Sequence, residues 1–198
     1  LCTKYGADTF RMYEMFLGPV EMSKPWDTKG IEGVHRFLKK LWRLFFDETK
    51  GPIWTTTAPS PSERAGGEVP TNAELKVLHK TIKKIEEDTE RFSFNTGVST
   101  FMICVNELTD LKCHKKEILE PLLILLAPYA PHIAEELYDQ LGSPVPLSTR
   151  GEGAGGKGSI LAASFPKWEE KYIKETSKTY PVAINGKTRT ELTLALDA

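Results

Sequence analysis

A helical pattern of apolar residues, repeated through the first 142 of the 198 residues, constrains the fold more than any other feature of the sequence. In its clearest stretch, apolar side chains return at steps of three and four residues along one face: Ile31, Val34, Leu38, Leu41 and Phe45. This spacing is typical of an α-helix that buries one face and exposes the other. Similar stretches predict a short helix over residues 8–16 and four more helices within residues 71–142. We therefore expect a mainly α fold.

Residues that begin or end helices divide this pattern into segments. Candidate N-caps precede three of the helices: Asp27 or Thr28, Thr71 with Glu74 in a capping box, and Asn95 or Thr96. Pro131 suits the first turn of the last helix, where its missing amide hydrogen is not needed, and Gly142 suits the end of that helix. Five or six helices with mostly short connections predict an antiparallel, up-and-down helix bundle.

The pattern changes after residue 142. Residues 143–159 are rich in glycine and proline and predict a linker, as residues 51–70 predict a loop. Residues 180–184 and 188–196 alternate large and polar side chains around Asn185-Gly186, which predicts a short β-hairpin at the C-terminus. Because a lone hairpin is marginal in water, we expect it to begin a domain that the sequence truncates. The expected parts are a connecting helix in 1–26, the helical bundle in 27–142, a linker with a flexible loop in 143–179, and the start of the truncated domain in 180–198.

Composition narrows the class of protein. With 40% hydrophobic and 27% charged residues the chain is ordinary for a globular protein, and its formal net charge of -1 means that any positive surface needs an uneven distribution of charge. No apolar run approaches the roughly 20 residues that span a membrane, and the sequence does not begin like a signal peptide. The three cysteines form no C-x-x-C pair, which favours reduced thiols and a cytoplasmic protein.

One row of cations on a predicted helix is a candidate RNA-binding surface. Arg36, Lys40 and Arg43 share one face at about 100° per residue, and Lys39 flanks that face. These side chains could bind phosphates along an RNA stem. The alternative is a charged face that is simply solvated.

Two further groups of cations are weaker candidates. Lys80, Lys83 and Lys84 form a second helical row, but acidic residues follow it at once, so both interpretations stay open. Lys187 and Arg189 follow the predicted hairpin turn and could contact RNA or keep an edge strand soluble. Neither helical row has exposed aromatic residues between its cations, which favours contact with the RNA backbone over stacking on unpaired bases.

No residues are spaced for catalysis or metal binding. Residues 151–157 nearly match the phosphate-binding pattern G-x-x-x-x-G-K, but Gly158 replaces the serine or threonine that binds magnesium. A flexible insertion is therefore a better interpretation than an independent nucleotide-binding enzyme. The patterns G-x-S-x-G and H-E-x-x-H are absent. His132 has no partner at the spacing of metal ligands or nucleophiles, so we expect it to make a local hydrogen bond.

Several phrases of the sequence resemble the leucyl-tRNA synthetases, a family of class I aminoacyl-tRNA synthetases. They are YGADTFRMYEMFLGP from Tyr5, KPWDTKGIEGV from Lys24 and NGKTR from Asn185. A further phrase, LLAPYAPHIAEEL from Leu125, resembles the class I synthetases for leucine, isoleucine and valine as a group. The resemblance covers nearly the whole chain. It implies that residues 1–26 come from the end of the catalytic domain and that the helices form the anticodon-binding domain, which docks on tRNA.

The resemblance also implies ATP-dependent attachment of leucine to its tRNA, with ATP and Mg²⁺ used by the full-length enzyme. HIGH-type and KMSKS-type sequences and the editing insert are missing. We therefore expect the catalytic and editing domains of the same polypeptide to carry the chemistry, and this piece to need no cofactor and to be inactive alone. Its role would be to hold tRNA(Leu) as part of a monomer. The alternatives are the same role in an isoleucyl- or valyl-type synthetase, or a helical scaffold for protein assembly.

Overall fold

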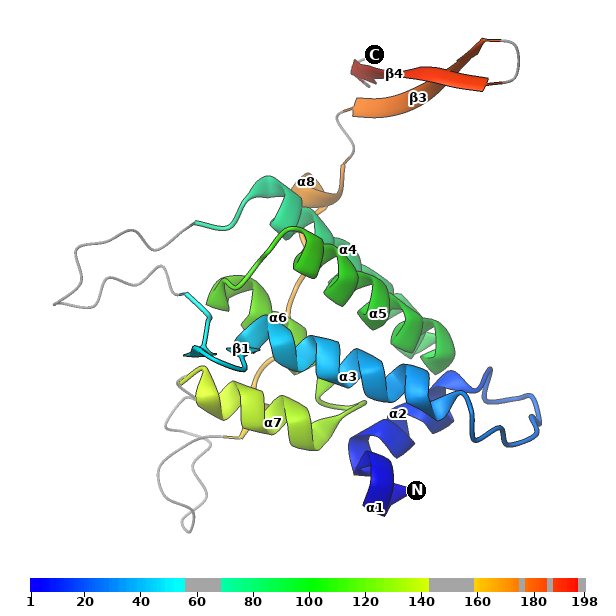
Figure 1. Ribbon diagram of the computed structural model, residues 1–198, viewed down its shortest axis with the longest axis vertical. Helices are drawn as coiled ribbons and strands as arrows, with labels where there is room; N and C mark the ends of the chain where they lie inside the picture. The colour runs from blue at the N-terminus through cyan, green and yellow to red at the C-terminus, as the bar shows by residue number, and fades with distance from the viewer. Residues whose placement is uncertain (56–68, 143–158, 175–176, 185–186, 196–198) are drawn as a thin grey trace, which may run out of the picture. The chain divides into compact units, whose positions relative to one another are not determined.

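The computed structural model describes residues 1–55, 69–142, 159–174, 177–184 and 187–195, which are mostly helical (Figure 1). The prediction of a mainly α protein is therefore confirmed. The chain separates into two compact units, Leu1–Trp168 and Glu169–Ala198. The first unit contains the helices that carry the candidate site, and the second contains a short helix and a β-hairpin.

The first unit is built mainly from helices. Their bounds are α1 Cys2–Tyr5, α2 Ala7–Phe16, α3 Ile31–Phe45, α4 Asn72–Glu90, α5 Phe94–Asp110, α6 Lys116–Leu126 and α7 Pro131–Gln140, with a 3-10 helix, η2, at Ile160–Ala162. A small antiparallel ribbon follows α3, in which β1 (Phe46–Asp47) pairs with β2 (Gly51–Pro52). The rest of the predicted loop, residues 56–68, and most of the predicted linker, residues 143–158, lie outside the described residues.

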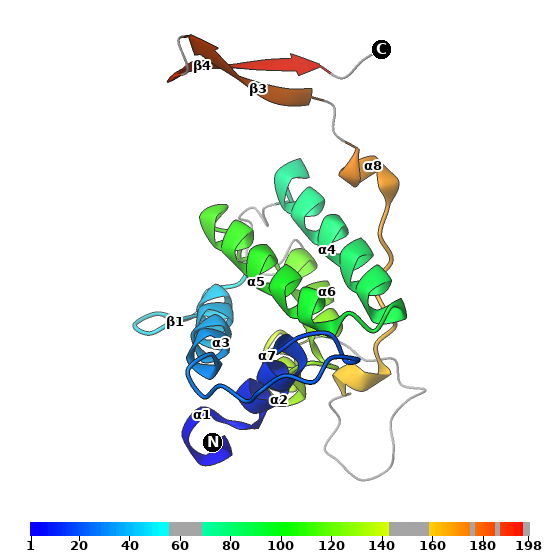
Figure 2. The same ribbon diagram turned by 90° about the vertical axis from the view of Figure 1, so that its right-hand side faces the viewer.

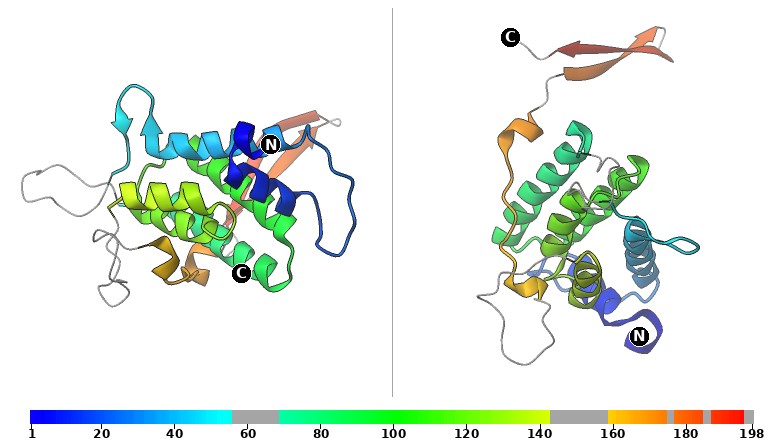
Figure 3. Two further views of the ribbon diagram at one scale, coloured as in Figure 1. Left: turned by 90° about the horizontal axis from the view of Figure 1, so that it is seen from below. Right: turned by 90° about the vertical axis from the view of Figure 1, so that its left-hand side faces the viewer.

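Two long helices, α4 and α5, lie side by side and run in opposite directions (Figures 2 and 3). Residues 91–93 join them, and Phe92 makes the reversal in the left-handed region with a φ of 54°. α5 also contacts α2 and α3, α4 contacts α6, and α6 contacts α7. These contacts bring the apolar faces of the helices together around one core.

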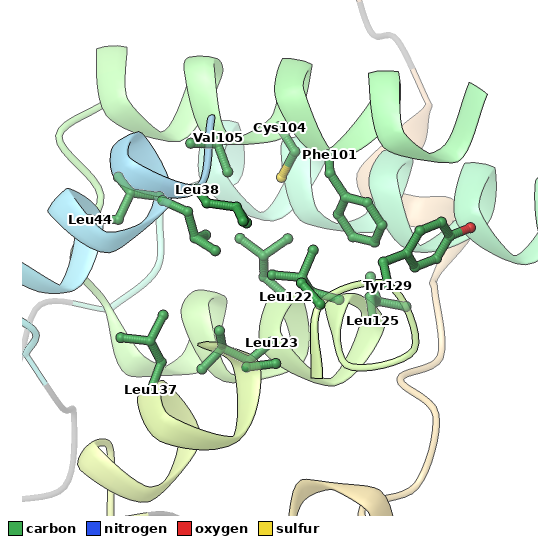
Figure 4. Close-up of a cluster of buried hydrophobic side chains, with 14 of the residues drawn as sticks. Leu38, Leu44, Phe101, Cys104, Val105, Leu122, Leu123, Leu125, Tyr129 and Leu137 are labelled. Atoms are coloured by element: carbon green, nitrogen blue, oxygen red, sulfur yellow. The ribbon is translucent and has the colours of Figure 1, made fainter. Parts of the chain in front are cut away.

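A cluster of buried apolar side chains lies where α3, α5 and α6 meet (Figure 4). Among its buried side chains are Leu38 and Leu44 of α3, Phe101, Cys104 and Val105 of α5, and Leu122, Leu123 and Leu125 of α6. Burying one such leucine or phenylalanine stabilises a fold by about 1.5–3 kcal/mol. Burial also raises the pKa of the Cys104 thiol to about 12, so this cysteine stays protonated and packs as a small apolar residue.

Three predicted helix boundaries are confirmed. The side chain of Thr71 accepts a hydrogen bond from the Glu74 amide at 3.3 Å, and the Glu74 carboxylate accepts one from the Thr71 amide at 2.6 Å, which completes the capping box. Pro131 is the first residue of α7. Gly142 follows the end of α7 with a φ of 62°, a left-handed conformation that glycine adopts without strain.

The predicted N-cap of α3 is wrong. The helix begins at Ile31 after Gly30, and neither Asp27 nor Thr28 caps it. Asp27 instead accepts a hydrogen bond from the amide of Lys29 at 2.9 Å, which closes a local turn before the helix. Such turns are the usual competitor of N-capping for aspartate side chains.

The predicted N-cap of α5 is also wrong. The helix begins at Phe94 after Ser93, so Asn95 and Thr96 lie within its first turn. The amide of Ser93 donates to the carbonyl of Asp88 at 2.8 Å, which ties the connection tightly to the end of α4. The new helix starts directly after that bond, earlier than the sequence predicts.

α7 receives its N-terminal cap from a distant helix. Ala130, which precedes α7, makes no side-chain cap. The buried carboxylate of Asp8 in α2 accepts hydrogen bonds from the amides of His132 at 3.3 Å and Ile133 at 2.7 Å, and it also contacts His132 Nδ1 at 2.7 Å. The local bond predicted for His132 is therefore wrong, because Asp8 precedes it by 124 residues.

The second unit contains α8 (Glu170–Ile173) and an antiparallel pair of strands, β3 (Ser177–Ile184) and β4 (Lys187–Ala195). Ile184 pairs with Lys187 at the closed end of the hairpin. The predicted turn, Asn185-Gly186, lies outside the described residues. The small sheet agrees with the alternating pattern of large and polar residues in this part of the sequence.

Candidate nucleic-acid interface

Four of the predicted cations lie along one groove on the first unit. The groove runs between α3 and the end of α5, has a volume of about 540 Å³, and is lined by Arg36, Lys39, Lys40, Arg43, Leu44, Thr109, Lys112 and His114. We call it the basic groove. The structure thus brings the whole first row together and adds two basic residues from another part of the chain.

The amphipathic pattern of α3 determines how its cations face. Leu38, Leu41 and Phe45 are buried on the core side of the helix. Because the opposite side cannot then be buried against the same core, Arg36 and Arg43 are exposed there. This side of α3 forms the first wall of the basic groove.

The cations of this wall differ in how firmly they are held. Lys40 is partly buried, and its Nζ donates a hydrogen bond to Asn106 Oδ1 of α5 at 2.7 Å, which links the two helices. Arg43 Nη2 lies 3.7 Å from Glu48 Oε1, with side chains that are 67% and 86% exposed. An ion pair this exposed contributes about 0–1 kcal/mol, so Arg43 can exchange Glu48 for another anion.

The second wall is the connection between α5 and α6. Lys112 follows the C-terminus of α5 in a left-handed conformation, with a φ of 52°, and its amide donates to the carbonyl of Thr109 at 3.0 Å. This helix end presents the Lys112 side chain to solvent. His114 Nδ1 lies 2.8 Å from the carbonyl oxygen of Leu44, which joins the second wall to α3.

The sequence alone did not single out Lys112 or His114. Both residues lie far along the chain from α3, and the bend after α5 places them opposite its cations. The available signal was the basic character of residues 112–116 directly after an amphipathic helix. Which surface these residues line depends on the tertiary fold, and the periodicity of the sequence does not predict that fold.

The second predicted row lies on α4 and is engaged with its own chain. Lys84 Nζ lies 2.5 Å from the buried carboxylate of Asp88, and Lys83 Nζ lies 4.7 Å from the centre of the Trp168 ring. Lys80 also makes an interaction within the protein. None of the three lines the basic groove. The structure therefore does not bring the two rows together.

Lys187 and Arg189 belong to β4, and their side chains lie outside the described part of the structure. Both residues are in the second unit, whereas the basic groove is in the first. Their candidate role in RNA binding stays a prediction.

The expectation that the first row has no exposed aromatic residue is wrong. Trp42 lies between Lys39 and Arg43 on α3, and 39% of its surface is exposed. One side of its ring stacks on Phe46, with the ring centres 4.6 Å apart and the planes at 16°. The elements that pack around α3 leave Trp42 partly uncovered.

Within the residues that the structure describes, no group of histidine, cysteine, aspartate or glutamate side chains is arranged to hold a metal ion. In that same part of the chain, none of the helices has the length and apolar composition needed to cross a membrane. The residues that line the basic groove supply cations and hydrogen-bond donors. Such a set of groups binds phosphate or other anions.

Comparison with known proteins, by family model and by sequence, finds matches to tRNA ligases. The family model described as the anticodon-binding domain of tRNA ligase matches residues 73–198. The chain is 55% identical over 197 residues to the leucine-tRNA ligase of Cytophaga hutchinsonii, with 100% of this chain and 19% of that protein covered. It is 53% identical over 197 residues to the leucine-tRNA ligase of Christiangramia forsetii, with coverages of 100% and 18%. The chain thus spans about a fifth of the length of these curated relatives.

A solved structure shares the fold. It is the ternary complex of Agrobacterium radiobacter K84 agnB2 LeuRS with tRNA and LeuAMS, which matches with a TM-score of 0.67 and 24% sequence identity. The match covers 100% of this chain and 24% of the neighbour's chain.

Proposed function

Because the chain belongs to the family of anticodon-binding domains of tRNA ligases, we propose that it docks tRNA(Leu) on a leucine-tRNA ligase. The identity of more than half to two leucine-tRNA ligases supports leucine over isoleucine or valine as the amino acid of the longer enzyme. The structural neighbour is a complex that contains tRNA, which supports tRNA as the partner.

The observation that carries this proposal is the basic groove. Its cations come from two separate parts of the chain, α3 and the end of α5, although the formal net charge of the whole chain is only -1. If the cations of α3 were only solvated, positive side chains on a second element facing them would not be expected. Positive side chains on both walls suit the phosphate backbone of RNA, which carries one negative charge per nucleotide.

The proposal includes the organisation of the longer enzyme. Residues 1–26 would connect to the catalytic domain, residues 27–142 would form the antiparallel bundle that docks tRNA, residues 143–179 would be a linker, and residues 180–198 would contribute to a separate small domain. ATP, with its Mg²⁺, and leucine would react in the catalytic domain, and an editing domain would belong to the same polypeptide. The enzyme would act as a monomer in the cytoplasm, and this chain alone would be inactive.

Salt titration of tRNA binding tests the proposal in the complete protein. Arg36→Gln, Lys40→Gln and Arg43→Gln together remove three charges from the basic groove. Each lost phosphate contact should flatten the slope of log K against log salt by about 0.9, so the triple variant should bind tRNA more weakly and with less salt dependence. An unchanged affinity and slope would reject the groove as the docking surface.

The α4 row supplies a matched control. Lys80→Gln, Lys83→Gln and Lys84→Gln change the net charge by the same amount at a place outside the groove. The first row should have the larger effect on the slope. If the α4 variant has the larger effect, the tRNA docks on α4 instead. If the protein is instead a helical scaffold for protein assembly, both variants should bind tRNA equally and with no preference over other RNA. The protein should then also run as a stable oligomer on sizing chromatography.

A further inference from the structure

The exposed ring of Trp42 lines a second hollow beside the basic groove. This hollow lies between the start of α2, the middle of α3 and the start of α7, and has a volume of about 560 Å³. Its walls include the side chains of Tyr5, His35, Leu38, Lys39, Trp42 and Ile133. We call it the aromatic hollow. Its volume lies within the range of small-ligand sites, which is roughly 300–1,000 Å³.

The ring of Trp42 is supported by aromatic neighbours on one side. Its ring stacks on Phe46, and Phe46 in turn packs edge-on against Trp54 with ring centres 5.4 Å apart. Tyr5 and His35 make a further edge-on pair at 5.5 Å on another side of the hollow. Rigid rings of this kind offer a flat surface at little cost in conformational entropy.

Lys39 joins the two sites, because its side chain lines both the basic groove and the aromatic hollow. Arg43 lies one helical turn further along α3 and lines a smaller hollow together with Trp42 and Phe46. Phosphates bound by Lys39 and Arg43 would therefore lie beside the exposed ring of Trp42, which directly precedes Arg43 in the sequence. This is the arrangement of cations and rings that binds single-stranded nucleic acid.

We propose that the aromatic hollow takes one unpaired nucleotide of the RNA whose backbone lies in the basic groove. The base stacks on Trp42, and Lys39 pairs with the adjoining phosphate. This inference rests on the proposed function, since it concerns the same RNA. It extends that function from contact with the backbone to recognition of an unstacked base.

The rim of the hollow can hydrogen-bond to the edge of a base. His132 lines the hollow, its side chain is 77% exposed, and its Nδ1 is held by Asp8. The imidazole can therefore offer only Nε2 to a ligand. Glu136 also lines the rim and is exposed. A base stacked on the rings of this largely apolar hollow would have Lys39, His132 and Glu136 within reach of its polar edge.

Substitution of Trp42 in the complete protein tests the inference. Trp42→Ala should weaken tRNA binding by about 5- to 150-fold, the range for one stacked base, at every salt concentration. The slope against log salt should stay the same, because no charge is removed. Trp42→Phe should keep most of the affinity. The control is Trp26→Ala, since Trp26 is 42% exposed, as Trp42 is 39% exposed, and lines neither site.

The outcomes separate this inference from the proposed function. If Trp42→Ala binds tRNA as the unmodified protein does while the triple groove variant binds weakly, the hollow holds no base and the docking function stands. If the groove variant also binds normally, the basic groove is not the docking surface, and the inference about the hollow falls with it. Should Trp42→Ala fail to fold, Trp42→Leu fills the space without a ring. Weak binding by Trp42→Leu beside normal binding by Trp42→Phe supports stacking, and equal binding by the two overturns it.

Discussion

The carboxylate of Glu74 and the ammonium group of Lys115 form an ion pair that is almost closed to solvent. Lys115 Nζ lies 3.0 Å and 2.8 Å from the two carboxylate oxygens, and the side chains are only 7% and 4% exposed for Lys115 and Glu74. Glu74 belongs to the first turn of α4, and Lys115 precedes α6. The pair therefore holds the connection that forms the second wall of the basic groove.

Removing one partner of this pair should be strongly destabilising. Lys115→Met leaves the Glu74 carboxylate buried without its main partner, and we expect the free energy of unfolding in urea to fall by about 3–5 kcal/mol. The double variant Glu74→Gln with Lys115→Met removes both charges and should recover part of that loss. If the single variant unfolds at the same urea concentration as the unmodified chain, the pair is not buried in solution.

The same pair should make the free energy of unfolding depend on pH. Burial alone would raise the pKa of Glu74, but the hydrogen bonds from Lys115 and Thr71 outweigh burial and hold the pKa below its ordinary value of 4.5. A lowered pKa in the folded state means that Glu74 stabilises the fold above pH 4.5 and that this contribution is lost as the pH falls through the lower, folded value. Urea unfolding between pH 6 and pH 3 should therefore show a smaller loss of stability in Glu74→Gln. Equal pH profiles for the two proteins would contradict this.

Gly97 should be required by close packing rather than by its backbone conformation. A Cβ atom at this position would lie 2.6 Å from the Tyr129 hydroxyl oxygen and 3.3 Å from the ring carbon that bears it. Gly97→Ala should therefore destabilise the protein, although alanine is favoured over glycine by about 1 kcal/mol within a helix. Tyr129→Phe removes the nearest atom, so Gly97→Ala should be much less harmful in that background. Thermal unfolding of the four proteins measures this, and additive effects would contradict it.

The cap that Asp8 supplies to α7 should contribute measurably to stability. Asp8→Ala removes the acceptor for the amides of His132 and Ile133, and the loss of such a cap costs about 0.5–2 kcal/mol. Asp8→Asn keeps one carbonyl oxygen and should retain part of the cap. Urea unfolding gives the comparison, and equal stability of Asp8→Ala and the unmodified protein would show that water replaces the carboxylate.

Sequence reasoning predicted the features that depend on neighbours along the chain. The capping box of Thr71 and Glu74, the position of Pro131 and the end of α7 at Gly142 all depend on residues within a few positions of one another. The exposed face of Arg36 and Arg43 likewise follows from the period of α3. Helix starts were less predictable where a turn competed for the same side chain, as at Asp27.

The features that sequence reasoning missed depend on tertiary contact. Asp8 is 124 residues from His132, and Glu74 is 41 residues from Lys115, so no local spacing connects them. Lys112 faces α3 only because α5 ends where it does. Periodicity gives the direction of a side chain on its own helix, but it does not say which other helix covers that side.

The central claim is that both walls of the basic groove bind one RNA backbone, and Lys112 tests it most directly because it lies on the wall that α3 does not provide. The measurement is the salt dependence of tRNA affinity for Lys112→Gln in the complete protein, with Lys29→Gln as a control that also loses one exposed lysine but lies outside the groove. We predict that the slope of log K against log salt flattens by about 0.9 for Lys112→Gln and stays unchanged for Lys29→Gln. Equal slopes for Lys112→Gln and the unmodified protein would contradict the account.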